Sequence, residues 1–343
     1  MYDVIVVGAG PAGSAAARAL AEEGCRVLLA ERCKLPRYKS CSGQLIQKTL
    51  DLVEDYFGEP VPLSAMCTPT ENRGVILTDD GGNTFRFEQN GRNVWRSAFD
   101  QWLAGKAAEV GVEVRDDTAV LACEEGEGVV TVTLKSEGRT YVEQARYVVD
   151  GEGVTGMLKR KLTGKKPAFI TTYQTYNRGT VDLDPYYFYA WLQQDLSQYD
   201  AWFNVKDGQL VLGVSVRDGS RVDEYFPKFI EYMQDRHGLR IVQELKRDRW
   251  LMHRVRPGCP IDLGVGRIFF VGETAGFLNP MGEGVSSAIE SGHRLGLAIA
   301  AHFDDPRAVL AAYETAVKPL QAYMQRQWDL VSGMSDAFRD MNL

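Results

Sequence analysis

Val4-Ile-Val-Val-Gly8-Ala-Gly10-Pro-Ala-Gly13 opens the chain with an apolar run that leads directly into a G-x-G-x-x-G turn. Between a strand and a helix, a turn of this spacing lets a dinucleotide pyrophosphate reach the backbone N–H groups of the helix N-terminus. The alanine-rich segment from Ser14 to Glu23, stopped by Gly24, has the composition of that helix. The stretch therefore predicts a Rossmann-like α/β fold and a dinucleotide cofactor.

A second parallel strand is expected from Val27 to Ala30, ending at Glu31 and Arg32. Glu31 comes eighteen residues after Gly13, where a carboxylate accepts hydrogen bonds from the ribose hydroxyls of an adenosine and disfavours a 2′-phosphate. The alternative is a surface glutamate that follows a strand. The complete order of strand, glycines, helix, strand and acid favours the ribose.

A second glycine-rich run, from Gly272 to Gly284, reads Gly-Glu-Thr-Ala-Gly-Phe-Leu-Asn-Pro-Met-Gly-Glu-Gly. It follows a strand-like segment from Arg267 to Val271 and precedes a helix from Val285 with an apolar stripe. Two such turns, about 260 residues apart, predict a flavin gripped from two directions. The alternative is a tight turn without ligand, but so many glycines cost entropy unless something approaches closely.

Length and charge limit the classes of function. At 343 residues the chain is expected to fold as two interleaved domains, and its formal charge of −7 argues against nucleic acid as a partner. The N-terminus starts with a strand pattern rather than a signal peptide, which favours a cytoplasmic protein. Since no apolar run approaches the roughly 20 residues that span a bilayer, we expect membrane contact to be peripheral at most.

The cysteines and histidines predict neither a disulfide framework nor a metal site. Six cysteines are scattered without a C-x-x-C pair, and a cytoplasmic chain of this size does not need disulfides. None of the four histidines stands at ligand spacing to another histidine or to a cysteine pair.

β-branched and aromatic residues alternate from Phe169 to Val216, and an earlier hairpin is expected from Val75 to Phe87. These separated segments predict one antiparallel sheet that forms a substrate domain, covering residues 73–87 and 168–256. The FAD-binding domain is expected to comprise residues 1–72, 88–167 and 257–343, including C-terminal helices from Pro306 onward.

Three further segments complete this prediction. A helix is expected from Trp95 to Val110, and a meander of valine-rich strands ends at Asp150-Gly151. The basic run Lys159-Arg160-Lys161, with Lys165-Lys166 after it, is interpreted as a solvated helix face rather than a lipid or partner patch.

On these residues the chain resembles the geranylgeranyl reductase branch of FAD-dependent oxidoreductases with the para-hydroxybenzoate hydroxylase fold. The resemblance covers nearly the whole chain. It is carried by the two glycine-rich turns, by Glu31-Arg32, by Arg96 with Asp100, by Asp150-Gly151, and by Pro36-Arg-Tyr-Lys-Ser-Cys41-Ser-Gly43. Only the Cys41-Ser-Gly43 segment points to the reductase branch in particular.

The resemblance assigns one set of residues to the nucleotide half of FAD. The glycine turn would donate to the pyrophosphate, Glu31 would hold the ribose, Arg32 and the backbone at Val120 would contact the adenine, and Arg96 would reach the phosphates or ribityl chain. The full set is Gly8, Gly10, Ala12, Gly13, Glu31, Arg32, Arg96, Val120 and Asp150.

A second set would hold the flavin half. Glu273 stands where the family usually has an aspartate that contacts the ribityl chain, and the helix N-terminus near Val285 would favour negative charge on a reduced ring. Cys41, Ser42 and Gly43 would face the ring. The other members of the set are Gly272, Pro280, Gly282 and Gly284.

Cys41 is the candidate catalytic residue. If hydride adds to an alkene, the carbon opposite must be protonated, and a thiol can supply that proton only when its pKa is shifted. The alternative is a neutral packing residue.

The aromatic strand residues suggest a substrate cavity formed by Trp202, Tyr187 and Tyr189. Related reductases carry Tyr-x-Trp-x-Phe-Pro, whereas this chain has Asp200-Ala-Trp-Phe-Asn-Val205, which keeps only the tryptophan. Because strands alternate, core packing is the stronger expectation for any single aromatic residue of this strand.

Three functions are compatible with these residues. The first is reduction of carbon–carbon double bonds in an apolar isoprenoid or lipid-like molecule by hydride from reduced flavin, with NAD(P)H or a ferredoxin-like protein as electron donor. The second is hydroxylation of an aromatic or polyketide-like compound by an FAD-dependent monooxygenase. The third is electron transfer to a protein partner.

Overall fold

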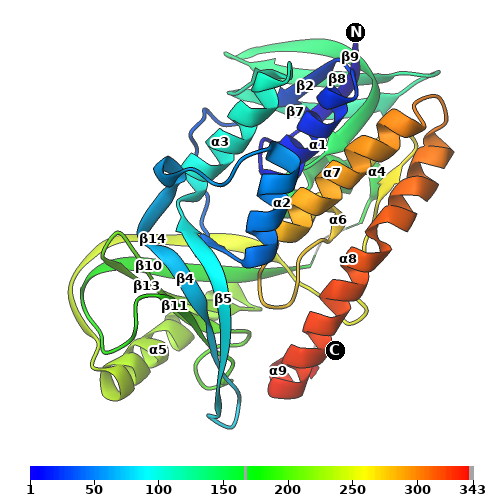
Figure 1. Ribbon diagram of the computed structural model, residues 1–343. Helices are drawn as coiled ribbons and strands as arrows, with labels where there is room; N and C mark the ends of the chain where they lie inside the picture. The colour runs from blue at the N-terminus through cyan, green and yellow to red at the C-terminus, as the bar shows by residue number, and fades with distance from the viewer. Residues whose placement is uncertain (166–167, 340–343) are drawn as a thin grey trace.

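The computed structural model describes residues 1–165 and 168–339, and these form two eight-stranded sheets with helices packed around them (Figure 1). The sheet that carries the N-terminus lies at the top of Figure 1, and the second sheet lies at the lower left. Helix α8 (Pro306–Met334) runs down the right side from the level of the first sheet to that of the second.

The first sheet has the strand order β15-β16-β9-β1-β2-β6, and β8 adds β7 to it by pairing with β9. The pairs from β16 to β6 are parallel, so the carboxyl ends of β1, β2 and β9 meet at one edge. Its strands are β1 (Tyr2–Val7), β2 (Val27–Ala30), β6 (Glu113–Arg115), β7 (Thr118–Glu125), β8 (Val130–Ser136), β9 (Arg139–Asp150), β15 (Gly264–Val265) and β16 (Ile268–Phe270). This confirms the predicted Rossmann-like class.

The second sheet has the order β14-β10-β13-β12-β11-β4-β5-β3. It is antiparallel except where β11 runs parallel to β4. Its strands are β3 (Gln44–Leu45), β4 (Met66–Thr78), β5 (Thr84–Val94), β10 (Phe169–Thr180), β11 (Tyr187–Trp191), β12 (Ala201–Lys206), β13 (Gln209–Val216) and β14 (Arg240–His253).

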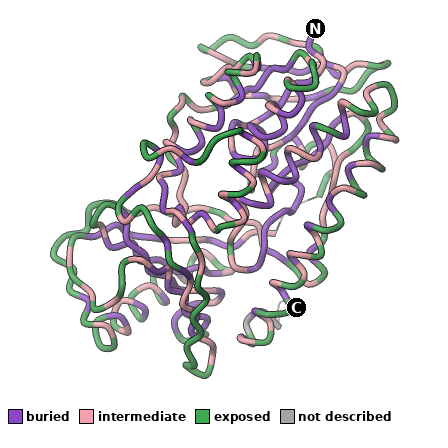
Figure 2. The backbone as a smooth tube through the Cα atoms, in the orientation of Figure 1, coloured by how far each residue is buried: buried purple, intermediate pink, exposed green. Residues whose placement is uncertain are grey.

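The β4–β5 hairpin is longer than the segment 75–87 that the sequence predicts. Polar residues such as Glu71 and Asn72 interrupt the apolar alternation by which a strand is predicted. Their backbones still pair with β5, with a register shift on either side. Figure 2 shows that the outer part of this hairpin is largely exposed.

The helices include a close crossing of α1 (Pro11–Glu22) and α7 (Val285–Ala301), which a glycine of α7 permits. A Cβ added at Gly292 of α7 would lie 2.0 Å from the carbonyl oxygen of Ala12, so only glycine lets α7 approach α1. The remaining helices are α2 (Gln47–Phe57), α3 (Arg96–Glu109), α4 (Met157–Thr163), α5 (Val222–His237), α6 (Gly272–Ala275) and α9 (Asp336–Arg339). Within the described ranges, none of these helices has both the length and the apolar character needed to cross a membrane.

The C-terminal helices tie the two sheets together. Tyr147 of β9 donates to the carbonyl of Phe303, just before α8. At the other end of α8, the Ser335 hydroxyl lies within hydrogen-bond distance of Asp80 at the tip of the β4–β5 hairpin, at 3.2 Å, and of the carbonyl oxygen of Leu192, at 3.3 Å. The helix therefore fixes the distance between the first sheet and the hairpin.

Candidate functional site

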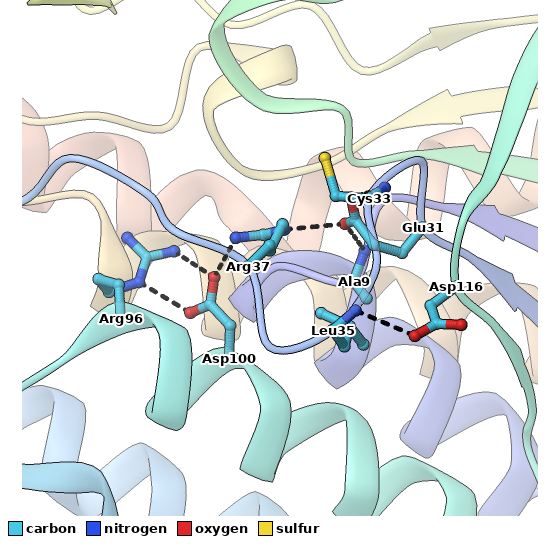
Figure 3. Close-up of polar contacts among 8 residues, drawn as sticks. All are labelled: Ala9, Glu31, Cys33, Leu35, Arg37, Arg96, Asp100 and Asp116. Atoms are coloured by element: carbon cyan, nitrogen blue, oxygen red, sulfur yellow. Dashed lines mark hydrogen bonds and ion pairs between the residues drawn. The ribbon is translucent and has the colours of Figure 1, made fainter.

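Glu31 lies at the carboxyl end of β2, against the turn that follows β1 (Figure 3). Its carboxylate accepts hydrogen bonds from the backbone N–H groups of Ala9 and Cys33, both at 3.0 Å, and pairs with Arg37 at 3.1 Å. Asp116 holds the same loop by accepting from the backbone of Leu35. The carboxylate of Glu31, which is predicted to bind the ribose, is therefore buried and held in one orientation by the protein itself.

A chain of charges links Glu31 to the start of α3. Arg37 donates to Asp100 at 2.9 Å, and Asp100 also receives two hydrogen bonds from Arg96, at 2.7 and 2.9 Å (Figure 3). Burial alone would raise the pKa of Asp100, but the guanidinium groups of Arg96 and Arg37 outweigh burial and lower it. Buried carboxylates therefore hold both arginines in fixed positions, with Arg37 beside Gly10 of the glycine turn.

The predicted glycines form a tightly packed cradle. A Cβ at Gly13 would lie 1.9 Å from the carbonyl oxygen of Gly8, and one at Gly8 would lie 2.6 Å from that of Gly151. A Cβ at Gly272 would lie 2.8 Å from the Ala12 side chain. The structure thus brings together glycines from three segments that are far apart in the sequence, while a Cβ at Gly10 would have only Arg37 nearby, at 3.6 Å.

Asp150 ends β9 under this cradle. It is fully buried, and its Oδ1 accepts from the backbone of Glu152 at 3.0 Å. Burial, helped by the neighbouring Glu152 carboxylate, raises the pKa of Asp150 to about 8. Arg32 is exposed beyond the cradle, and Val120 is buried in β7, which starts beside Glu31 because Thr118 donates to the Glu31 carbonyl.

The second glycine-rich run forms α6, a loop and the start of α7. Asn279 shapes the loop by accepting from the backbones of Met281 and Glu283, and Gly284 precedes α7. Glu273 accepts from the backbone of His253 at the end of β14.

Tyr199 connects this loop to the second sheet and to the C-terminus. Its hydroxyl donates to the carbonyl oxygen of Pro280 at 2.6 Å, and its ring packs against Phe338 of α9. The residue is 1% exposed, so the hydrogen bond has no competition from water. Tyr199 therefore fixes the position of the Pro280 backbone, which is one of the predicted flavin contacts.

We expect Tyr199→Phe to lower the free energy of unfolding by about 1–2 kcal/mol, because the buried Pro280 carbonyl loses its donor. Tyr147→Phe is the matched control, since Tyr147 makes the same kind of hydrogen bond to Phe303, also at 2.6 Å, away from the loop. Urea unfolding should show similar losses for both variants, but only Tyr199→Phe should release FAD faster. Equal FAD release from the two variants would contradict this assignment.

Cys41 lies half-buried in the segment after Arg37, where its thiol accepts from the backbone of Gly43 at 3.3 Å. Burial would raise the pKa of this thiol, but the positive charges of Arg96, Lys39 and Lys206 outweigh burial and lower it. A partly accessible thiol in a positive environment is the setting in which cysteines are reactive.

One face of the second sheet lies against this segment. Asn204 of β12 donates to the carbonyl oxygen of Ser42 at 3.3 Å, and Trp202 lies two residues earlier on the same face. The Trp202 ring covers Gly213, where a Cβ would lie 2.1 Å from it. Trp202 is therefore on the side of the sheet that the cavity prediction requires.

Tyr187 and Tyr189 are on the other face, which corrects their placement in the predicted cavity. Tyr189 pairs with Phe203 rather than Trp202, and the odd-numbered residues of β11 pack under α5, in one core cluster with Phe229. Strand alternation is the physical reason, because neighbouring residues of a strand point to opposite faces. The two tyrosines are core residues of the second sheet.

The basic run also differs from its interpretation as a solvated face. Lys159 of α4 points inward, donating to the carbonyl of Thr274 at 2.8 Å, and lies 3.7 Å from Asp262. It borders a cavity of about 310 Å³ that Glu273 and Arg256 also line. Arg160 and Lys161 are exposed as expected, and Lys166 lies outside the described residues.

Several residues of the site were not predicted from the sequence, and the reason differs from one residue to the next. Arg37 and Lys39 lie inside the segment quoted for the resemblance, but nothing local shows which of its cations turn inward. Lys206 precedes the turn residues Asp207-Gly208, so its sequence context predicts a lysine in an exposed turn. Tyr199 reads as a loop residue, and only the fold shows its contact with Pro280.

The site residues fit a dinucleotide flavin. The first N–H groups of α1 have no acceptor within the helix, and they lie at the glycine cradle beside Arg37, which is linked through Asp100 to Arg96. A buried carboxylate, Glu31, stands at the end where an adenosine ribose would lie. The donor set therefore matches a pyrophosphate at the turn and a ribose beside it.

Comparison with known proteins agrees with this geometry. A family model described as an FAD binding domain matches residues 1–327. The digeranylgeranylglycerophospholipid reductase of Methanosarcina acetivorans is 24% identical over 351 aligned residues, which cover 97% of this chain and 82% of the relative.

Solved structures share the fold. A geranylgeranyl bacteriochlorophyll reductase-like protein from Thermoplasma acidophilum superposes with a TM-score of 0.84 at 20% identity, covering 97% of this chain and 87% of the other. A triple mutant of a flavin-dependent brominase superposes with a TM-score of 0.73 at 21% identity, covering 97% and 90%. The chain belongs to the FAD binding domain family, as an FAD-dependent oxidoreductase with geranylgeranyl reductases among its relatives.

Proposed function

We propose that this oxidoreductase saturates carbon–carbon double bonds of an isoprenoid or lipid-like molecule. The observation that carries the proposal is the Cys41 thiol, half-buried among cations and next to a sheet face that bears Trp202. The reductase named among the relatives, aligned over nearly the whole chain, supports the same substrate class.

Different residues of the chain would hold different parts of FAD. Gly10, Ala12 and Gly13 would hold the pyrophosphate of FAD, and Glu31 its ribose. FAD, when bound and reduced, supplies the hydride. Tyr199 would keep the Pro280 backbone in place at the flavin end.

Cys41 would supply the proton. A general acid works best when its pKa lies near the working pH, and the cations around Cys41 lower the pKa of the thiol from its ordinary value. The second sheet would cover the reacting carbons and exclude water. The electron donor, NAD(P)H or a ferredoxin-like protein, remains a prediction.

The test is anaerobic turnover with a geranylgeranylated phospholipid after dithionite reduction, with products followed by mass spectrometry. We expect products that gain one pair of hydrogens for each bond reduced. Cys41→Ser should slow this by about 10²-fold, the usual contribution of a general acid. Cys25→Ser, which changes a half-buried cysteine in the loop after α1, should leave the rate near that of the wild type. No hydrogenated product from any prenyl lipid would reject the proposal.

A second candidate, hydroxylation of an aromatic or polyketide-like compound, has one observation in its favour. The sheet face near Cys41 also carries polar groups: Gln174 donates to the Tyr176 hydroxyl at 2.8 Å, and Tyr176 lies 3.2 Å from the Tyr38 hydroxyl. Such groups suit an aromatic substrate with oxygen substituents. Substrate-dependent oxygen uptake with one hydroxylated product per oxygen would favour this function over alkene reduction.

A further inference from the structure

Lys206 is a buried lysine at the end of β12, on the sheet face that carries Trp202 and Asn204. It is 1% exposed, and in the described part of the chain no carboxylate pairs with it. A Cβ added at Gly43 would lie 2.5 Å from its Nζ, so the ammonium lies directly against the Cys41-Ser-Gly43 segment. Burial of this cation lowers the pKa of Lys206, while negative charge at the neighbouring thiols of Cys67 and Cys41 would favour the charged ammonium.

The position of Lys206 is fixed by its neighbours. Its Nζ lies 4.2 Å from the centre of the Trp95 ring, within range of a cation–π interaction. The Trp95 indole N–H donates to Asp207 at 2.6 Å, and Asp207 also accepts from the backbone of Thr68 at 2.7 Å. These two donors occupy the carboxylate of Asp207. The ammonium of Lys206 lies instead against the Cys41-Ser-Gly43 segment.

Cys41 is faced by cations from three separate elements. Lys39 comes from its own segment, Arg96 from α3 and Lys206 from β12, and all three stabilise a thiolate at Cys41. The carboxylates act mainly on these cations: Asp100 on Arg96, and Glu273 on Lys39.

Two other titratable groups face the same space and remain neutral. Burial raises the pKa of Tyr176 of β10 to about 12, with Asp248 and Cys41 adding to the effect. Burial also raises the pKa of Cys67, the second thiol near Lys206, to about 12. Cys41 is therefore the group among these whose charge Lys206 can change.

We propose that Lys206 is a positioning residue that, together with Arg96 and Lys39, sets the ionisation of Cys41, and through it the proton supply of this site. The use of that proton rests on the proposed function. Saturating a double bond takes one hydride, which bound and reduced FAD would supply, and one proton. The Cys41 S–H bond breaks as the second carbon–hydrogen bond forms, the thiolate stays beside Lys206, and a proton from water restores the thiol.

The ionisation of Cys41 can be measured without substrate. The full chain, with FAD bound and after FAD removal, is treated with iodoacetamide from pH 5 to pH 10, and alkylation of the Cys41 peptide is followed by mass spectrometry. In Lys206→Met the profile should move to higher pH, and alkylation at pH 7 should slow by about tenfold, the lower end of the effect of one neighbouring charge.

Two variants separate charge from structure. Lys206→Arg keeps the cation and should keep the wild-type profile, which a merely structural role would not predict. Lys228→Met removes an exposed lysine of α5, which pairs with Glu224 at 3.2 Å, and should change nothing. Coincident profiles for wild type and Lys206→Met, or no alkylation of Cys41 at any pH in either form, would overturn the inference. A shifted profile in an enzyme that saturates no prenyl lipid would reject the proposed function alone.

Discussion

Gly13→Ala should prevent stable FAD binding and lower the free energy of unfolding by about 3 kcal/mol or more, the upper range for overpacking. The added Cβ would lie 1.9 Å from the carbonyl oxygen of Gly8 and 3.3 Å from a methyl carbon of Val6. Backbone cannot move aside as a flexible side chain can, so the turn itself must open. The N–H groups that face the pyrophosphate would then point elsewhere.

Gly105→Ala is the matched control for this prediction. Gly105 is exposed inside α3, and a Cβ there would have nothing within 4 Å. Alanine at an exposed helix position should stabilise the protein by about 0.5–1 kcal/mol. Urea unfolding and the flavin absorbance of the purified protein measure both effects. Full flavin content in Gly13→Ala would show that the turn accommodates a side chain and would remove the argument for a tight cradle.

The nucleotide end of the site could be predicted because its signals are local. Gly13 and Glu31 stand at fixed distances along one strand, helix and strand, and the fold places both as expected. Such residues are constrained by the backbone geometry of their own segment. Sequence spacing alone therefore carries the prediction.

The flavin end could not be predicted in the same way, because its contacts join distant segments. Tyr187 and Tyr189 lie in a well-predicted strand, but the face that they occupy depends on the pairing of β11 with β12. Lys206 meets Gly43 only because β12 crosses the segment after Arg37. A one-residue change in register would exchange the two faces, and nothing in the strand's own sequence fixes that choice.

Asp100→Asn should be among the most damaging substitutions outside the glycine turn. Asp100 is fully buried and accepts hydrogen bonds from both Arg96 and Arg37, so the amide would remove the carboxylate that pairs with Arg96 and would leave Arg37 with Glu31 alone. Removing one partner of a buried pair costs about 3–5 kcal/mol. We expect a loss of this size in unfolding free energy at pH 7, together with weaker FAD binding. Asp304→Asn is the control, because Asp304 pairs with Arg146 while 93% exposed and should matter by less than about 1 kcal/mol.

The pH dependence of the stability difference between wild type and Asp100→Asn shows whether the substitution acts by removing a charge or by disrupting packing. In the folded protein the pKa of Asp100 lies below its ordinary value, since the two guanidinium groups outweigh burial. The carboxylate therefore stabilises the fold fully above the unfolded pKa, about 3.9, and that stability is lost as the pH falls through the folded pKa. The gap in unfolding free energy between wild type and Asp100→Asn should be constant from pH 7 to pH 5 and shrink below about pH 4. A gap that persisted unchanged at lower pH would mean that the amide disrupts packing, and that the charge of Asp100 is not what holds Arg37 and Arg96 in place.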